Sequence, residues 1–184
     1  MELSVERENQ IIATVSYIHR RMGFYHPPFS FQQFFQLFSD YQIVPAHLPQ
    51  GYDGELLLKK DKKIIRYRLG SRERTIRFTL AHEIAHSFLH RTSSHRCQLS
   101  RRVRIYRSSA RTPKEQEADF FALELLVPMP MLDRIAPALE KEEKEKISRI
   151  GSELARIFGI NTQTMQARLR DLLIYREWEE GKWL

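Results

Sequence analysis

Two histidines and a glutamate stand at a spacing that suits metal-dependent hydrolysis. The segment is His82-Glu83-Ile84-Ala85-His86, in which the histidines are four residues apart. On a helix both imidazoles project from one face, so they can bind one metal ion while Glu83 acts as general base on a water held there. The residues around this segment are mostly apolar, and polar side chains in a buried helix are costly unless they have partners or a function. Two histidines satisfied by hydrogen bonds in the core are the structural alternative.

A catalytic zinc also needs a third protein ligand and one position that stays open to water. A second apolar segment offers three acids, Glu115, Glu117 and Asp119. Glu115 and Asp119 are four residues apart and share a helical face. We therefore expect Glu115 to bind the metal and Asp119 to orient a ligand histidine by accepting its other N–H. Glu117 points elsewhere and is the alternative ligand.

Two helices must position these residues. Apolar spacing predicts one helix over about 75–91 and another from Pro113 to about Pro128. We expect His90 to be a helix-end residue, because a fourth protein ligand would close the site to water. A loop of about 20 residues separates the two helices, and loops of that length are usually functional. It could equally be a mobile lid or recognise an acidic surface of a substrate through Arg91, Arg96, Arg101, Arg102, Arg104, Arg107 and Arg111.

The rest of the chain predicts a mixed, α+β fold. Residues 4–22 have the spacing of an amphipathic helix, and Ser30 with Gln33 indicates a capping box that opens a short helix. Short apolar runs between residues 41 and 69 predict a small three-stranded antiparallel sheet, with 59–63 as a hairpin tip. A helical pair is expected over about 147–183. We divide the chain into a domain of residues 1–135 and a helical segment of residues 136–184 packed on it.

Length and composition limit the class of protein. The 184 residues are 42% hydrophobic and 11% aromatic, which suits one domain with a hydrophobic core. We find no stretch apolar enough to span a membrane and no signal peptide at the start, so a soluble, unexported protein is expected. The single cysteine, Cys97, fits a reducing cytoplasm.

Positive charge is concentrated in the middle of the chain. The formal net charge is +7, and residues 59–111 hold 16 Lys and Arg against three acids. Such a block can attract nucleic acid or an acidic partner. Since no known binding module accompanies it, a solvated surface is the simpler interpretation, and nucleic acid is the less favoured partner.

Two motifs in this order resemble the ImmA/IrrE family of bacterial metallopeptidases. They are Arg77-Phe78-Thr79-Leu80-Ala81-His82-Glu83-Ile84-Ala85-His86 and Glu115-x-x-Ala118-Asp119-x-Phe121-Ala122. The resemblance implies a zincin-like core, with zinc bound by His82, His86 and Glu115 and with Glu83 as the base. It also implies a protein substrate, a DNA-binding transcriptional repressor. The family often has Asn at the position of Asp119 and usually Gly at that of Ala85, which are mild departures.

The tail has the pattern of a helix-turn-helix, with a turn at Gly159. A DNA-binding version would present Gln163, Gln166, Arg168 and Arg170 to DNA. Relatives in the family carry a similar segment packed on the peptidase domain, so we favour packing over DNA binding.

Together these features predict a cytoplasmic, zinc-dependent endopeptidase that cleaves a repressor through a metal-activated water, with Glu83 as general base. Two other functions stay open at this point. One is a zinc-containing regulatory module that binds DNA or a partner protein without cleaving it. The other is a zinc-dependent hydrolase that acts on a different bond.

Overall fold

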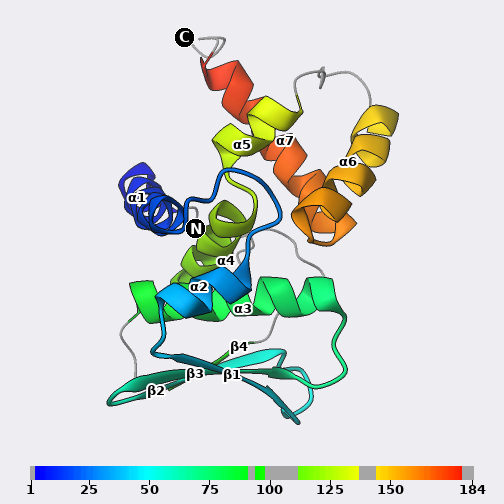
Figure 1. Cartoon of the computed structure of the whole chain (residues 1–184). Helices are drawn as coiled ribbons and strands as arrows, with labels where there is room; N and C mark the ends of the chain where they lie inside the picture. The colour runs from blue at the N-terminus through cyan, green and yellow to red at the C-terminus, as the bar shows by residue number, and fades with distance from the viewer. Residues whose placement is uncertain (1–2, 91–93, 98–111, 137–143, 180–184) are drawn as a thin grey trace.

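The computed structural model describes residues 3–90, 94–97, 112–136 and 144–179, and it confirms the α+β class (Figure 1). The helices of these parts are α1 (Val5–Met22), α2 (Phe31–Leu37), α3 (Glu73–Leu89), α4 (Pro113–Leu126), α5 (Met129–Ile135), α6 (Lys144–Phe158) and α7 (Thr162–Glu179). The strands are β1 (Tyr41–Ala46), β2 (Gly54–Lys59), β3 (Lys62–Arg68) and β4 (Ser94–Cys97). None of these helices combines the length and the apolarity needed to cross a bilayer.

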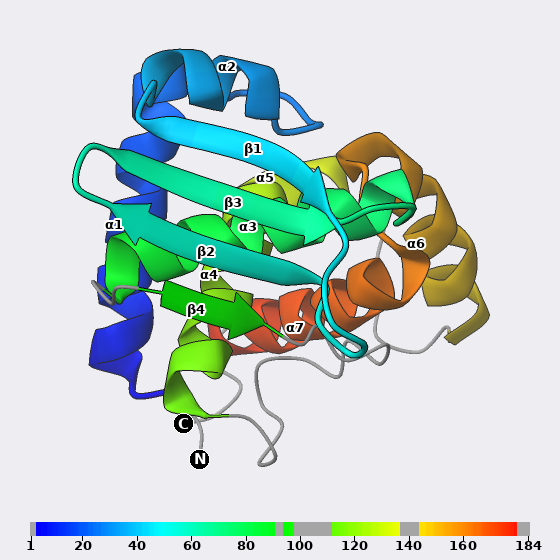
Figure 2. The ribbon, with the colours of Figure 1, turned by 90° about the horizontal axis from the view of Figure 1, so that it is seen from below.

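The sheet differs from the expected one in two respects. Within the described residues its order is β1-β3-β2-β4, so four strands pair there instead of three, and β1 runs parallel to β3 (Figure 2). The pairs β2–β3 and β2–β4 are antiparallel. The chain leaves β1 through a connection rather than a tight hairpin, which lets β3 take the place beside β1. The fourth strand lies within the segment expected to be a structureless loop.

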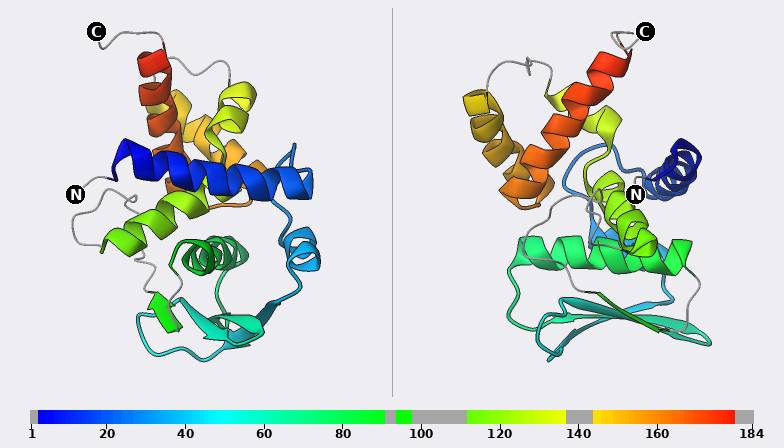
Figure 3. Two further views of the ribbon diagram at one scale, coloured as in Figure 1. Left: turned by 90° about the vertical axis from the view of Figure 1, so that its left-hand side faces the viewer. Right: turned by 180° about the vertical axis from the view of Figure 1, so that it is seen from behind.

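The helices lie on one face of the sheet, in layers (Figures 1 and 3). Helix α3 crosses the sheet against β2 and β3, α4 packs on α3, and α1 packs on α4. The middle of α3, from Phe78 to His86, is buried throughout. A helix covered by a sheet on one side and by a helix on the other needs apolar residues all round. The polar residues of this stretch therefore lie in the centre of the molecule.

Local capping explains where the first helices begin and end. The Ser4 side chain accepts a hydrogen bond from the backbone N–H of Arg7 at the start of α1, and Gly23 ends that helix in a left-handed conformation, with φ of 60°. The Ser30 side chain likewise accepts from the N–H of Gln33. The Gln33 amide does not complete the expected box, because it donates instead to the carbonyl of Met22, 2.6 Å away. This bond ties α2 to the end of α1.

The last two helices pack against each other and are anchored to the helices beneath them. Arg168 of α7 is 1% exposed, pairs with Glu124 of α4, and donates through Nε to the carbonyl of Val127 at 3.1 Å. This corrects the expectation that Arg168 could touch DNA. Gln163 and Arg170 are exposed, and Gln166 is half-buried. Packing of this segment is thus supported, while the division of the chain at residue 135 stays a prediction.

Candidate metal centre

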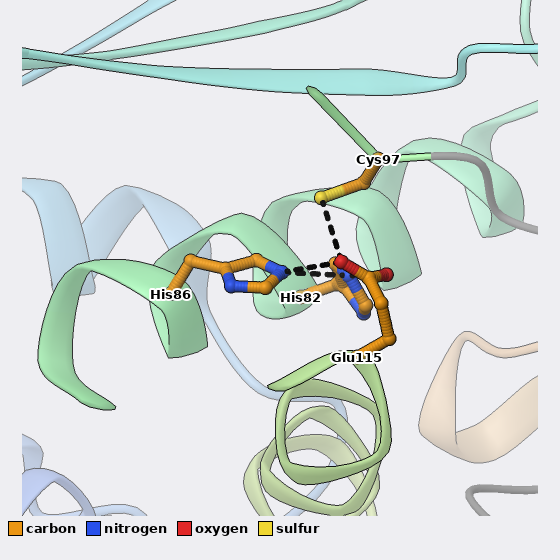
Figure 4. A group of neighbouring side chains, drawn as sticks. All are labelled: His82, His86, Cys97 and Glu115. Atoms are coloured by element: carbon orange, nitrogen blue, oxygen red, sulfur yellow. Dashed lines mark hydrogen bonds and ion pairs between the residues drawn. The ribbon is translucent and has the colours of Figure 1, made fainter. Parts of the chain in front are cut away.

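His82 and His86 lie one turn apart on α3 and face the same way (Figure 4). Both residues are completely buried. Their Nε2 atoms are 3.1 Å apart. Two imidazole nitrogens with lone pairs directed at one point are the basis of a metal site.

Glu115 reaches the histidines from the first turn of α4. The Thr112 side chain accepts a hydrogen bond from the backbone N–H of Glu115 and sets the start of this helix, with Pro113 in the first turn. The carboxylate then extends toward α3, with Oε2 3.2 Å from Nε2 of His82 and Oε1 3.4 Å from Nε2 of His86. The structure therefore brings together the three residues expected to bind metal.

The separations of these donor atoms fit a small tetrahedral ion. Zinc bonds to nitrogen and oxygen of about 2.0–2.2 Å place neighbouring ligand atoms about 3.3–3.6 Å apart in a tetrahedron. The three separations given above run from 3.1 to 3.4 Å. The side chains of Glu115, His82 and His86 can accordingly hold a metal ion with little rearrangement.

Cys97 joins the group from the sheet side, a position that no sequence motif predicted. It is the last residue of β4, it is completely buried, and its Sγ lies 4.0 Å from Oε1 of Glu115 (Figure 4). One potential ligand atom from each of Cys97, His82, His86 and Glu115 lies within 4.8 Å of the others. Burial raises the pKa of the Cys97 thiol well above its ordinary value.

Glu83 is completely buried beside this group. Neither carboxylate oxygen accepts a hydrogen bond from an N–H or O–H group of the residues that the structure describes. Burial raises the pKa of Glu83 from 4.5 to about 7. A buried carboxylate without such partners is costly, and a reacting water or substrate would supply them.

Gly54, the first residue of β2, lets the sheet pass directly over Glu83. A Cβ atom at this position would lie 2.4 Å from Oε1 of Glu83 and 2.6 Å from Cγ2 of Thr79. Both separations are far shorter than any contact between such atoms, so a side chain here would displace the strand or the carboxylate. Glycine thus has a steric role at residue 54.

Asp119 lies one turn beyond Glu115 and faces His82 from the other side. Its Oδ1 is 3.0 Å from Nδ1 of His82. An ionised carboxylate can only accept, so Nδ1 keeps its proton and Nε2, which faces the group, is the nitrogen that can bind a metal ion. Burial alone would lower the pKa of His82, but Cys97 and Asp119 outweigh it and raise that pKa well above 6.5, so binding of a metal ion at Nε2 would release a proton.

His86 has an outer partner of a different kind. Its Nδ1 is 2.9 Å from Nδ1 of His90, whose Nε2 is 2.8 Å from Oε2 of Glu117. That same oxygen accepts a hydrogen bond of 2.6 Å from Arg7 of α1. The four candidate ligands His82, His86, Cys97 and Glu115 are called the metal-ligand group below. Glu117, the alternative ligand, thus lies outside this group and supports it through His90.

The protonation states in this series of hydrogen bonds follow from the charge of Glu117. Burial alone would raise the pKa of Glu117, but Arg7 and His90 outweigh it and lower that pKa, so the carboxylate is an acceptor. His90 must then donate from Nε2, which leaves its Nδ1 to accept from His86. The lone pair of His86 Nε2 consequently faces the metal-ligand group.

The residues of the two motifs were predicted from the sequence, whereas those contributed by other elements were not. The contacts of Cys97, Gly54 and Arg7 depend on strand register and helix packing, and no local pattern marks them. His90 was expected only as a helix-end residue, and it is indeed the C-cap of α3. The arginine-rich loop lies outside the described residues, apart from the backbone of Arg96.

Comparison with known proteins identifies one family. The family model described as the IrrE N-terminal-like domain, a peptidase family, matches residues 40–170. This range includes the sheet, α3, α4 and most of the C-terminal helices, and it leaves out α1 and α2. No curated protein matches the chain.

Proposed function

Because the chain belongs to the family of the IrrE N-terminal-like domain and is therefore a metallopeptidase, we propose that it is a zinc endopeptidase whose ligands are His82, His86 and Glu115. Two imidazoles and a carboxylate are a donor set that suits zinc. The separations of 3.1–3.4 Å between these donor atoms support the assignment. When bound, the ion would lower the pKa of a water and polarise the carbonyl of the scissile bond.

We assign the role of general base to Glu83, and the single observation that carries this assignment is its buried carboxylate, which accepts no hydrogen bond from an N–H or O–H group of the described residues. Glu83 would accept a proton from the attacking water and later deliver it to the amine that leaves. Its surroundings suit both steps, since a carboxyl with a pKa near neutrality is readily protonated and readily deprotonated.

Asp119 and His90 are positioning residues in this proposal. Asp119 holds the His82 proton on Nδ1, and His90 does the same for His86 through a different acceptor. Each contact keeps a ring in the tautomer that presents Nε2 to the metal. Neither residue touches the reacting atoms.

The substrate that we propose is a DNA-binding transcriptional repressor, on the basis of the family resemblance. The test is to incubate the zinc-loaded chain with a repressor encoded beside it, with and without a chelator. Cleavage that stops in chelator and in Glu83→Gln supports the proposal. A repressor that stays intact under all conditions, while a peptide library is cleaved, would show that the substrate is a different protein.

DNA binding by the C-terminal helices is not favoured as a second function. Arg168, at the centre of the proposed DNA-reading helix, is committed to Glu124 and Val127 inside the molecule. The described packing therefore supports a structural part for α7.

A further inference from the structure

We propose that Cys97 is a fourth protein ligand of the metal, so that the resting site is closed by two histidines, a glutamate and a cysteine. The inference rests on the proposed metal site and adds to it a residue from a separate element of the fold. It concerns the sheet edge nearest the metal-ligand group, where β4 ends.

Strand register aims the Cys97 side chain at α3. Cys97 lies directly opposite Gly54 in the antiparallel pair of β2 and β4. Side chains of directly opposed residues project to the same face of a sheet. A side chain at residue 54 would point at Glu83 and Thr79 of α3, so Cys97 points toward α3 as well. A slip of one residue would turn it to the other face.

The backbone around Cys97 is held in place. Its carbonyl accepts a hydrogen bond of 3.1 Å from the N–H of Asp53, which continues the ladder past the end of the strand pair. The strand carrying the sulfur is therefore tied to β2 directly above Glu83. The position of the thiol is a product of the sheet and not of an unsupported loop.

The sulfur atom lies at a distance that suits coordination. A zinc–sulfur bond of about 2.3 Å places the sulfur about 3.6 Å from neighbouring tetrahedral ligands. The Sγ atom is 4.0 Å from Oε1 of Glu115 and within 4.8 Å of a donor atom on each histidine. A side-chain adjustment of about 1 Å would complete a tetrahedron.

The burial of the four side chains and the chemistry of their donor atoms also support a site with four protein ligands. Cys97, His82 and His86 are completely buried, and the Glu115 side chain keeps only 16% of its exposure. The carboxylate of Glu83, which accepts no hydrogen bond from an N–H or O–H group within the described part of the chain, lies beside them as a second sign that this space holds a ligand. Thiolate is a strong zinc ligand, and four protein ligands are the mark of a closed site. Peptide hydrolysis would then require Cys97 to leave the metal.

Cobalt binding to the full chain tests this inference without using activity. Co²⁺ alone is titrated into the wild type, Cys97→Ala and His82→Ala, and near-ultraviolet absorption reports a thiolate bound to cobalt. Cys97 is the only cysteine of the 184 residues, so the sulfur has one source. We expect a thiolate band in the wild type and no such band in Cys97→Ala. Metal binding to Cys97→Ala should be weaker than to the wild type by about 10- to 100-fold.

X-ray absorption of the zinc-loaded wild type gives the same answer without any substitution. One sulfur at about 2.3 Å from zinc supports the inference. Zinc or cobalt bound through nitrogen and oxygen only, with His82→Ala unable to bind, would overturn the role of Cys97 and leave the proposed peptidase site intact. Binding that is unaffected by His82→Ala would overturn both.

Discussion

His90 accepts a hydrogen bond from His86, Nδ1 to Nδ1 at 2.9 Å. Its Nε2 donates in turn to Glu117, whose carboxylate also accepts from Arg7. His90 thereby links the metal-ligand group to α1, a helix outside the matched family region. Outer partners of this kind fix the tautomer and orientation of a ligand histidine. The contact thus gives His90 a measurable role in metal affinity.

His90→Phe should lower zinc affinity by about 10- to 100-fold, because the ring of His86 loses its acceptor. His90→Gln should recover part of that loss, since an amide can accept from His86 and donate to Glu117. Competition with a chromogenic chelator measures both. His26→Phe, a substitution at an exposed histidine, is the matched control and should bind zinc as the wild type does. Unchanged zinc affinity in His90→Phe would show that His90 does not support metal binding.

Gly54→Ala should slow hydrolysis without removing zinc. The added methyl would lie 2.4 Å from Oε1 of Glu83, so the carboxylate or the strand must move. Displacement of a catalytic group by about 1 Å can cost about 100-fold in rate. The measurement is the rate of hydrolysis per bound zinc.

Gly70→Ala is the control for this change. An added Cβ at Gly70 meets no atom within 4 Å, but the residue has a φ of 79°. That substitution should lower stability through backbone strain and leave the rate per zinc unchanged. Equal rates in wild type and Gly54→Ala would contradict the steric role of Gly54.

Arg168→Met should destabilise the fold by about 3–5 kcal/mol, because it leaves the Glu124 carboxylate buried without its cation. Arg170→Met, two residues away at an exposed position, should stay within about 0.5 kcal/mol. Adding Glu124→Leu to Arg168→Met should recover much of the loss. Denaturant unfolding measures all four chains. Similar stabilities of the two single variants would argue against α7 being anchored through Arg168.

The free energy of unfolding should decrease as the pH falls, in part because His19 takes up a proton. Burial lowers the pKa of His19, whose Nε2 donates to the carbonyl of Leu125 at 3.0 Å, with the charge of Glu124 nearby. The unfolded chain therefore takes up the proton at higher pH than the folded one. The stability that neutral His19 contributes to the fold is complete above the ordinary pKa of 6.5 and declines as the pH falls below that value.

His19→Gln keeps a donor for Leu125 and cannot titrate. The free energy of unfolding of the wild type should thus fall more steeply than that of His19→Gln between about pH 7.5 and 5. The buried His90 contributes in the same direction in both chains and cancels in the comparison. Parallel pH profiles would show that His19 is not the group responsible.

The parts of the site that could be predicted are those that depend on residues close together in the sequence. Histidines at i and i+4 must share a helical face, and Pro113 marks the start of the helix that carries Glu115 and Asp119. These features depend on a few adjacent residues. The helices and the positions of both histidines, Glu115 and Asp119 were therefore within reach of the sequence.

The parts that could not be predicted depend on pairing between distant strands. The segment Ser94–Cys97 is polar and has no alternation of apolar residues, so only its pairing with β2 makes it a strand. The same pairing carries Cys97 to the metal-ligand group. The parallel arrangement of β1 and β3 likewise follows from the path of the chain between strands.

Zinc content and hydrolysis of a quenched fluorescent peptide library, both measured for Glu83→Gln, test directly whether Glu83 is the general base. We expect one zinc per chain, as in the wild type, with hydrolysis slowed by about 10²- to 10⁴-fold. His82→Ala should lose both zinc and hydrolysis. Wild-type hydrolysis by zinc-loaded Glu83→Gln would contradict the assignment of Glu83 as the base.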